Sequence, residues 1–176
     1  MAYAILRIQK TKRTAIASKN SHNMRLRKTE NADEDRREQN EVLIGSGNLK
    51  VDLKKRLTET DCSVRNSTTV VAQELVLTAS SDFFYNDKNE LERGKLNLWK
   101  KQQMKYLNEK FGENCINAVL HLDEQTPHIH AFVTPIVFNE KKQKNELNNK
   151  NFFLSDYKKA QNDYYSYNQY LGLKRG

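Results

Sequence analysis

The sequence predicts a single α+β domain built on an antiparallel sheet with flanking helices. A chain of 176 residues is the size of one ordinary domain and is long enough to bury a core. Strand-like and helix-like segments are mixed along it without the regular βαβ alternation of a parallel sheet. No internal repeat and no linker-like stretch divides the sequence. We therefore expect residues 1–176 to form one folding unit.

The first half of the chain is predicted to hold two strands with helical segments between them. Residues 2–9 are predicted as a strand, and the β-branched, apolar residues 68–79 (TTVVAQELVLTA) as the clearest buried strand. Residues 13–28 favour a helix, which would place His22 and Arg25, three positions apart, on one face. The remaining segments are a charged stretch at 28–40, a turn at 45–47 and a helix at 50–60.

The second half is predicted to hold two helices around a pair of adjacent strands. Residues 89–113 follow a helical pattern that Gly112 is suited to end. Two strands follow at 115–121 and 128–138, joined by the short loop DEQTP. Beyond them we expect a solvated Lys/Asn-rich loop at 139–151 and a helix at 155–171.

The composition points to a basic protein with a strongly solvated surface. Lys and Arg number 30 against 22 Asp and Glu, so the net charge is +8, and the mean hydropathy is −0.89. Excess positive charge suits an anionic partner, of which nucleic acid is the commonest. The two cysteines, Cys62 and Cys115, have no CxxC spacing, which argues against a disulfide framework or a thiolate metal site. The sequence shows no signal peptide and no apolar run that could span a bilayer, so a cytoplasmic location is expected.

Three of the four histidines lie close together in the segment HLDEQTPHIH, at positions 121, 128 and 130. His128 and His130 are two apart and therefore point to the same face of a strand. His121 ends the neighbouring strand, about 4.8 Å away across the ladder. The three imidazoles can thus converge on one divalent metal ion and leave coordination positions open for a substrate oxygen. A lone histidine would more often be a surface or core residue, but this spacing favours a metal site.

The acidic residues between these histidines are candidates for supporting the site. Asp123 and Glu124 are placed to orient an imidazole or a nucleophile. The alternative, that they are ordinary loop acids, stays open, more so for Asp123 than for Glu124.

The segment HLDEQTPHIHAFVTP resembles the metal motif of the Mob/Pre family of plasmid mobilisation relaxases, a branch of the HUH endonucleases. A second match lies upstream, where residues 22–25 (HNMR) are similar to the HNxR motif of that family. Asp33, Arg36 and Asn40 follow at spacings like those of its next polar segment, and the resemblance covers residues 3–176. It implies the HUH relaxase fold, with a central antiparallel sheet of about five strands and flanking helices.

The resemblance also implies a reaction. Relaxases of this type attack a phosphodiester at a plasmid transfer origin, leaving a 5′-phosphate joined to the protein and a free 3′-hydroxyl. The attacking group in this branch is the histidine of HNxR, here His22, and a neutral imidazole is a competent nucleophile when a base holds its other nitrogen. Glu124 is the nearest candidate for that base, and Arg25 could hold a phosphate oxygen with its planar fork. A divalent ion, Mn²⁺ or Mg²⁺, would polarise the phosphate while bound by His121, His128 and His130.

The partners implied are DNA and the conjugation machinery. Single-stranded or supercoiled plasmid DNA at the transfer origin is the expected substrate, held in part by basic side chains. The resemblance further implies a conjugative coupling protein, and a homodimer through a C-terminal dimerisation and membrane-association region that the sequence does not include. The expected DNA-binding residues are Asn23, Arg25, Arg36, Asn40 and Arg65, with Arg37, Lys141, Lys142 and Lys144 as further candidates.

Three alternatives stay open at this level. A tyrosine of the last predicted helix could be the nucleophile, although tandem tyrosines more often pack or stack on bases. A hydrolytic metallonuclease would use metal-bound water and form no covalent intermediate, and a non-catalytic origin-binding protein would keep the metal as a structural element. His22 distinguishes the relaxase from the last two alternatives, since neither of them needs a fourth histidine beside Arg25. The tyrosines of that helix are Tyr157, Tyr164, Tyr165, Tyr167 and Tyr170.

Overall fold

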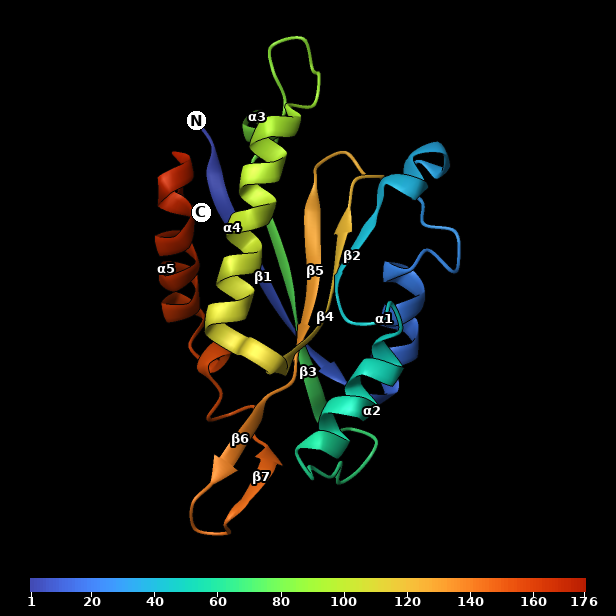
Figure 1. Cartoon of the computed structure of the whole chain (residues 1–176), viewed down its shortest axis with the longest axis vertical. Coiled ribbons are helices and arrows are strands. Elements are labelled where there is room, and N and C mark those ends of the chain that lie inside the picture. Colours follow the sequence, from blue (N-terminus) through green and yellow to red (C-terminus); the bar gives the residue numbers. More distant parts are fainter.

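A six-stranded sheet with helices on both faces forms the body of the molecule (Figure 1). The computed structural model describes the backbone of residues 1–176 and every side chain except that of residue 153. The strands are β1 (Tyr3–Lys12), β2 (Glu41–Ile44), β3 (Val70–Ala79), β4 (Cys115–His121), β5 (His128–Val133), β6 (Ile136–Asn139), β7 (Lys144–Leu147) and β8 (Lys174–Arg175). The helices are α1 (Ile16–Asn23), α2 (Leu49–Glu59), α3 (Ser81–Phe84), α4 (Arg93–Phe111) and α5 (Tyr157–Asn168).

The strand order of the sheet is β2-β4-β5-β3-β1-β8, and every pairing is antiparallel except that of the short β8 with β1. This confirms the α+β class and the antiparallel sheet that the sequence predicts. Strands β4 and β5 form a hairpin in which His121 lies opposite His128. Strand β3 borders β5 on its other side, with Thr78 opposite His128 and Val76 opposite His130. The histidine segment therefore occupies the middle of the sheet.

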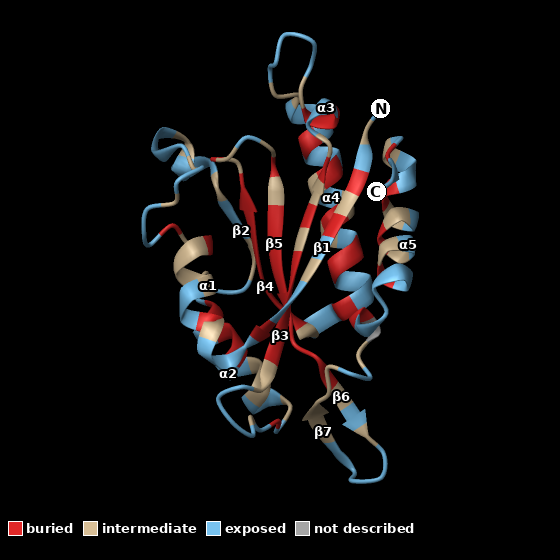
Figure 2. Cartoon of the chain, turned by 180° about the vertical axis from the view of Figure 1, so that it is seen from behind, coloured by how far each residue is buried: buried red, intermediate tan, exposed pale blue. Residues whose placement is uncertain are grey.

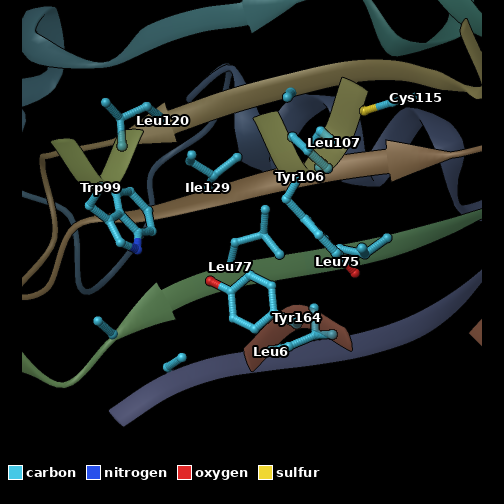
Figure 3. Packing of buried hydrophobic residues seen from close by; sticks show 14 of the residues in the cluster. Leu6, Leu75, Leu77, Trp99, Tyr106, Leu107, Cys115, Leu120, Ile129 and Tyr164 are labelled. Carbon is cyan, nitrogen blue, oxygen red and sulfur yellow. The ribbon is translucent and has the colours of Figure 1, made fainter. Parts of the chain in front are cut away.

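The face of the sheet under α4 and α5 carries the larger hydrophobic core. Alternate strand residues point to this face, as the two-residue period of a strand requires, and three aromatic side chains pack on them (Figure 3). These are Trp99 and Tyr106 of α4 and Tyr164 of α5, each at most 1% exposed. Burial raises the pKa of the Tyr164 hydroxyl well above its usual value. Tyr164 is thus a packing residue that holds α5 against the sheet.

The opposite face is only partly covered. A smaller hydrophobic cluster joins α1 and α2 to one end of the sheet, through Ile16, Leu49 and Leu53 packed near Phe132. In Figure 2, α1 and α2 lie on one side of the strands and α4 and α5 on the other, with exposed residues on the outer surfaces of the helices. Helix α1 therefore runs over the sheet face that carries the histidines, and His22 lies in its last turn.

The helix expected over 13–28 is the main local prediction that was wrong. A 3₁₀ turn precedes α1, and α1 ends at Asn23. Arg25 then adopts a φ of +53°, which no α-helix allows, so His22 and Arg25 do not share a helix face. Ion pairs of Arg25, described below, hold it in this conformation.

Three further differences concern strands. The strand expected over 128–138 is broken at Thr134 and Pro135, because proline lacks the N–H that a ladder needs. The loop expected over 139–151 contains β7, which pairs with β6 in a separate hairpin. Strand β2, which pairs with β4 at the edge of the sheet, was not predicted. Within the described part of the chain, no helix is long and apolar enough to cross a bilayer.

Candidate metal centre

The imidazoles of His121, His128 and His130 converge on one face of the central strands. One ring nitrogen of each lies within 4.8 Å of those of the other two. The ring centroids are 5.1 Å apart for His121 and His128, and 5.0 Å apart for His130 and either partner. His121 is fully buried and His130 is 9% exposed. The structure thus brings together the three side chains that the sequence predicts as metal ligands.

Each imidazole has an inner nitrogen, which faces the other two histidines, and an outer nitrogen on the far side of the ring. The outer nitrogen donates a hydrogen bond to a protein oxygen. Because a carbonyl or carboxylate oxygen only accepts, the outer nitrogen carries the proton and the inner nitrogen a lone pair. Such contacts fix both the tautomer and the orientation of a metal-binding histidine. The hydrogen bonds are His121 Nε2 to Asn23 O (2.9 Å), His128 Nδ1 to Thr126 O (2.8 Å) and His130 Nδ1 to Glu74 Oε1 (2.8 Å).

Two of the inner nitrogens face each other without a proton between them. Nδ1 of His121 and Nε2 of His128 are 3.3 Å apart. Two lone pairs at this separation repel unless a cation lies between them. Two nitrogens bound tetrahedrally to one ion, each at about 2.0–2.1 Å, would be about 3.4 Å apart. The spacing therefore fits a shared ion, and three nitrogen donors favour Mn²⁺ or another transition-metal ion over Mg²⁺, which prefers oxygen ligands.

Burial keeps His121 and His128 neutral at neutral pH. Burial lowers the pKa of His121 to about 2, and the positive charge of Arg25 acts in the same direction. Burial also lowers the pKa of His128. A neutral imidazole is the form that binds a metal, so protons would compete for these two ligands only in acid.

Glu74, on β3, is a candidate residue that the sequence analysis missed. Its Oε1 accepts a hydrogen bond from Nδ1 of His130, and its Oε2 pairs with Nζ of Lys19, on α1. Burial alone would raise the pKa of Glu74, but the hydrogen bonds from His130 and Lys19 lower it, so the group is ionised at neutral pH. The available signal was a charged residue in the middle of the apolar strand VVAQELVLTA, since an unpaired buried charge is costly.

Arg25 turns back from the end of α1 into the histidine loop. Its Nε and Nη2 donate to the two carboxylate oxygens of Asp123 at 2.7 and 2.8 Å, and Nη2 also donates to Oε1 of Glu124 at 2.6 Å. Nη1 donates to the carbonyl of His22 at 3.2 Å. Burial alone would raise the pKa of Asp123, but Arg25 lowers it to about 2. These contacts leave one of the five N–H donors of Arg25, on Nη1, so a phosphate bound by two donors would have to take one that a carboxylate or the His22 carbonyl now holds.

His22 lies over the histidine cluster. Its ring centroid is 5.7 Å from that of His130 and 6.3 Å from that of His121. Burial lowers the pKa of His22, and His130 and Arg25 lower it further, which favours the neutral imidazole. Among the described side chains, none forms a hydrogen bond with this ring. Glu124, the expected base, lies 3.7 Å from Nε2 of His128 and is paired with Arg25 instead.

Three of the residues expected to contact DNA surround the histidine hairpin. Asn23 is buried, and its carbonyl holds His121. Asn40 uses its side-chain oxygen to accept two backbone N–H groups of the loop after β4. Arg36 forms a partly exposed ion pair with Asp33 at 2.9 Å. Asn40 thus holds the loop after β4, and the backbone carbonyl of Asn23 orients the His121 ring.

Arg37, next to Arg36, lines a surface hollow with Arg25 and Asp123, whereas the remaining basic candidates lie at the opposite end of the sheet. Arg65 precedes β3, whose far end meets His128. Lys141, Lys142 and Lys144 belong to the β6–β7 hairpin, which projects from the end of the molecule remote from the β4–β5 loop (Figure 1). The structure therefore does not bring these cations to the histidine cluster.

The tyrosines of α5 also lie away from the cluster. Helix α5 packs with Tyr164 on the sheet face opposite the histidines, and the Tyr164 hydroxyl lies 3.4 Å from the carbonyl of Thr78. The sheet itself separates the two. Tyr164 is therefore not placed to act as the nucleophile, and the position of α5 behind the sheet does not favour its other tyrosines.

Comparison with known proteins places the chain in a family. The whole chain, residues 1–176, matches the Mob_Pre family, described as plasmid recombination enzyme. A plasmid recombination enzyme type 2 of Staphylococcus aureus is 31% identical over 158 residues, covering 84% of this chain and 36% of that protein. A 65 kDa protein of Zymomonas mobilis is 37% identical over 139 residues, covering 76% of this chain and 23% of that protein. The chain thus spans only the smaller part of the length of these curated relatives.

A solved structure shares the whole fold. It is the MobM relaxase domain bound to plasmid pMV158 oriT DNA, in a Mn-bound crystal structure. The two chains are 28% identical with a TM-score of 0.78, and the match covers 99% of this chain and 90% of that one. This chain belongs to the Mob_Pre family of plasmid recombination enzymes.

Proposed function

We propose that this chain is the DNA-nicking domain of a plasmid relaxase, which cleaves one strand at a transfer origin by transesterification and stays attached through His22. The observation that carries the proposal is the place of His22, a fourth imidazole whose ring lies 5.7 Å from His130 beside three convergent histidines. Membership of the Mob_Pre family supports plasmid DNA as the substrate. The MobM relaxase domain, which has the same fold, binds oriT DNA and Mn.

The proposed reaction forms one bond and breaks one. A lone pair of the His22 imidazole attacks phosphorus, the P–O3′ bond breaks, and the 3′-oxygen takes up a proton and leaves as a free hydroxyl. The second ring nitrogen of His22 gives up its proton to a base. The product is a phosphoramidate that joins His22 to the 5′-phosphate. The lowered pKa of His22 supports this role, because only the neutral ring has a lone pair to offer.

Glu124 is the proposed base, and Arg25 the proposed phosphate ligand. In the structure the two side chains pair with each other at 2.6 Å. An incoming phosphate is an anionic acceptor like a carboxylate and can replace Glu124 on the guanidinium, which keeps its two bonds to Asp123. Glu124 would then be free to accept the proton of His22. The same exchange would couple DNA binding to activation of the nucleophile.

The three histidines of the hairpin would hold the metal ion, for which Mn²⁺ fits their nitrogen donors. When bound, the ion polarises a phosphate oxygen and neutralises developing charge. The protein's own contribution is to keep three lone pairs aligned in advance through the oxygen acceptors of the outer nitrogens. The chain supplies these from Asn23, Thr126 and Glu74.

Two other functions are compatible with a three-histidine site. A hydrolytic metallonuclease would cleave with metal-bound water, and an origin-binding protein would keep the ion as a structural element. Neither explains a neutral imidazole at the position of His22. A conjugative coupling protein and a homodimer are further proposals, and they concern the whole length of proteins of this family.

Incubation with a supercoiled origin plasmid and Mn²⁺, followed by SDS, tests the proposal. We expect nicked DNA with protein attached, and neither product in saturating chelator or with His22→Ala. Nicked DNA without attached protein would favour the hydrolase. Specific binding with neither nick nor adduct would favour the origin-binding protein.

A further inference from the structure

The sheet face that carries the histidines is open over β3 and β1. Directly opposed residues of neighbouring strands point to the same face. Through His130, the register gives a row of Val119 on β4, Val76 on β3 and Arg7 on β1. Arg7 therefore belongs to the same face as His130. It lies two strand spacings, or about 10 Å, away along this row.

Contacts of α1 support this placement. Nζ of Lys19 donates to the side-chain oxygen of Gln9 at 2.7 Å and pairs with Glu74, which holds His130. Gln9 is two residues from Arg7 on β1, so both side chains lie on the face of His130. No helix covers Arg7 itself, which is exposed, while its neighbour in the row, Val76, is half-buried.

The cations closer to the histidines are already engaged. Arg25 is held by Asp123 and Glu124, and Lys19 by Glu74. Among the described residues, none forms a hydrogen bond or an ion pair with the side chain of Arg7. Its five N–H donors are thus available to an external anion on the open part of the face.

We propose that Arg7 binds a backbone phosphate of the DNA strand near the cleaved one, so that the strand crosses the open face from the histidines toward β1. This rests on the proposed function and adds a positioning residue to it. A guanidinium presents a planar fork that matches two phosphate oxygens. The half-buried, apolar side chains of Ile5 and Val76 beside Arg7 give a sugar or base a surface to rest on. Arg7 would hold the strand in register while His22 attacks.

Binding of a fluorescent single-stranded oligothymidine, measured in chelator so that no cleavage occurs, tests the contact directly. Arg7→Ala should weaken binding about tenfold, since a hydrogen-bonded charge pair is lost. It should also reduce the salt dependence of log K by about 0.7, the value of one phosphate contact on a single strand. Arg7→Lys keeps the charge without the planar fork, so its affinity should lie between those of the wild-type protein and Arg7→Ala. The matched control is Lys101→Ala, which removes an exposed cation from α4 on the other side of the sheet and should change affinity less than about twofold.

Nicking kinetics then separate this proposal from the proposed function. Arg7→Ala should raise KM and leave kcat near the wild-type value, because Arg7 positions the strand without touching the reacting atoms. Unchanged affinity in Arg7→Ala, or an equal loss in Lys101→Ala, would overturn the role of Arg7 even if the wild-type protein nicks DNA. If Arg7→Ala alone loses affinity and the wild-type protein does not nick DNA, the contact of Arg7 is supported and the nuclease is refuted.

Discussion

Arg25 and Asp123 form a two-pronged ion pair in the interior of the protein, with Nε to Oδ2 at 2.7 Å and Nη2 to Oδ1 at 2.8 Å. The pair joins the segment that follows α1 to the loop that follows His121. A backbone hydrogen bond from Asp33 to the carbonyl of Asp123, at 2.7 Å, adds a second link to the same loop. Residues far apart in the sequence are thereby fixed around the histidine cluster.

The pair should matter for stability. Arg25→Ala leaves the carboxylate of Asp123, 1% exposed, without its partner, and breaking a buried pair in this way costs about 3–5 kcal/mol. Urea unfolding measures this loss. Arg27→Ala, which removes an exposed arginine two residues along, should change the free energy of unfolding by less than about 0.5 kcal/mol. A loss below about 1 kcal/mol for Arg25→Ala would contradict the importance of the pair.

Glu74 should affect metal binding through His130. Glu74→Gln keeps the size of the side chain but removes the charge that orients His130 and makes it more basic. Loss of such a partner lowers metal affinity by about 10–100-fold. Titration calorimetry with Mn²⁺ gives the comparison, with Glu41→Gln, an exposed acid on β2 of the same sheet, as the control. Equal Mn²⁺ affinity in Glu74→Gln and Glu41→Gln would show that Glu74 does not support the site.

The buried histidines should make the metal-free protein sensitive to acid. The pKa of His121 is lowered to about 2, and those of His22 and His128 are also lowered, while an exposed histidine titrates near 6.5. As the pH falls below about 6.5, the unfolded chain takes up protons that the folded chain does not. The free energy of unfolding in chelator should therefore be complete above that pH and decline below it. Stability that stays constant from about pH 7.5 to about pH 5 would contradict neutral burial of these rings.

The convergence of His121, His128 and His130 could be predicted because the argument needs only local rules. His128 and His130 alternate on one strand, and a short loop forces the strand of His121 to pair beside them. The α+β class followed in the same way from the mixture of segments. Each of these inferences depends on neighbours in the sequence or on a single turn.

The remaining features depend on contacts between distant segments. Arg25 leaves the helical pattern because Asp123 and Glu124 hold it, and nothing near Arg25 in the sequence indicates this. Glu74 is recognisable as a site residue only once β3 is known to lie beside β5. The tyrosines of α5 could not be excluded as nucleophiles from the sequence. Only the fold shows that their helix lies on the other face of the sheet.

The residue that carries the DNA after cleavage tests the central claim most directly. The adduct formed with Mn²⁺ and an origin oligonucleotide can be digested with protease and mapped by mass spectrometry, with and without brief treatment in acid. We predict a nucleotide on the peptide that contains His22, released by acid because the bond is a phosphoramidate. We also predict no adduct from His22→Ala, although this variant should bind Mn²⁺ and DNA as the wild-type protein does. An acid-stable adduct on a tyrosine, or adduct formed at the normal rate by His22→Ala, would contradict the assignment of His22 as the nucleophile.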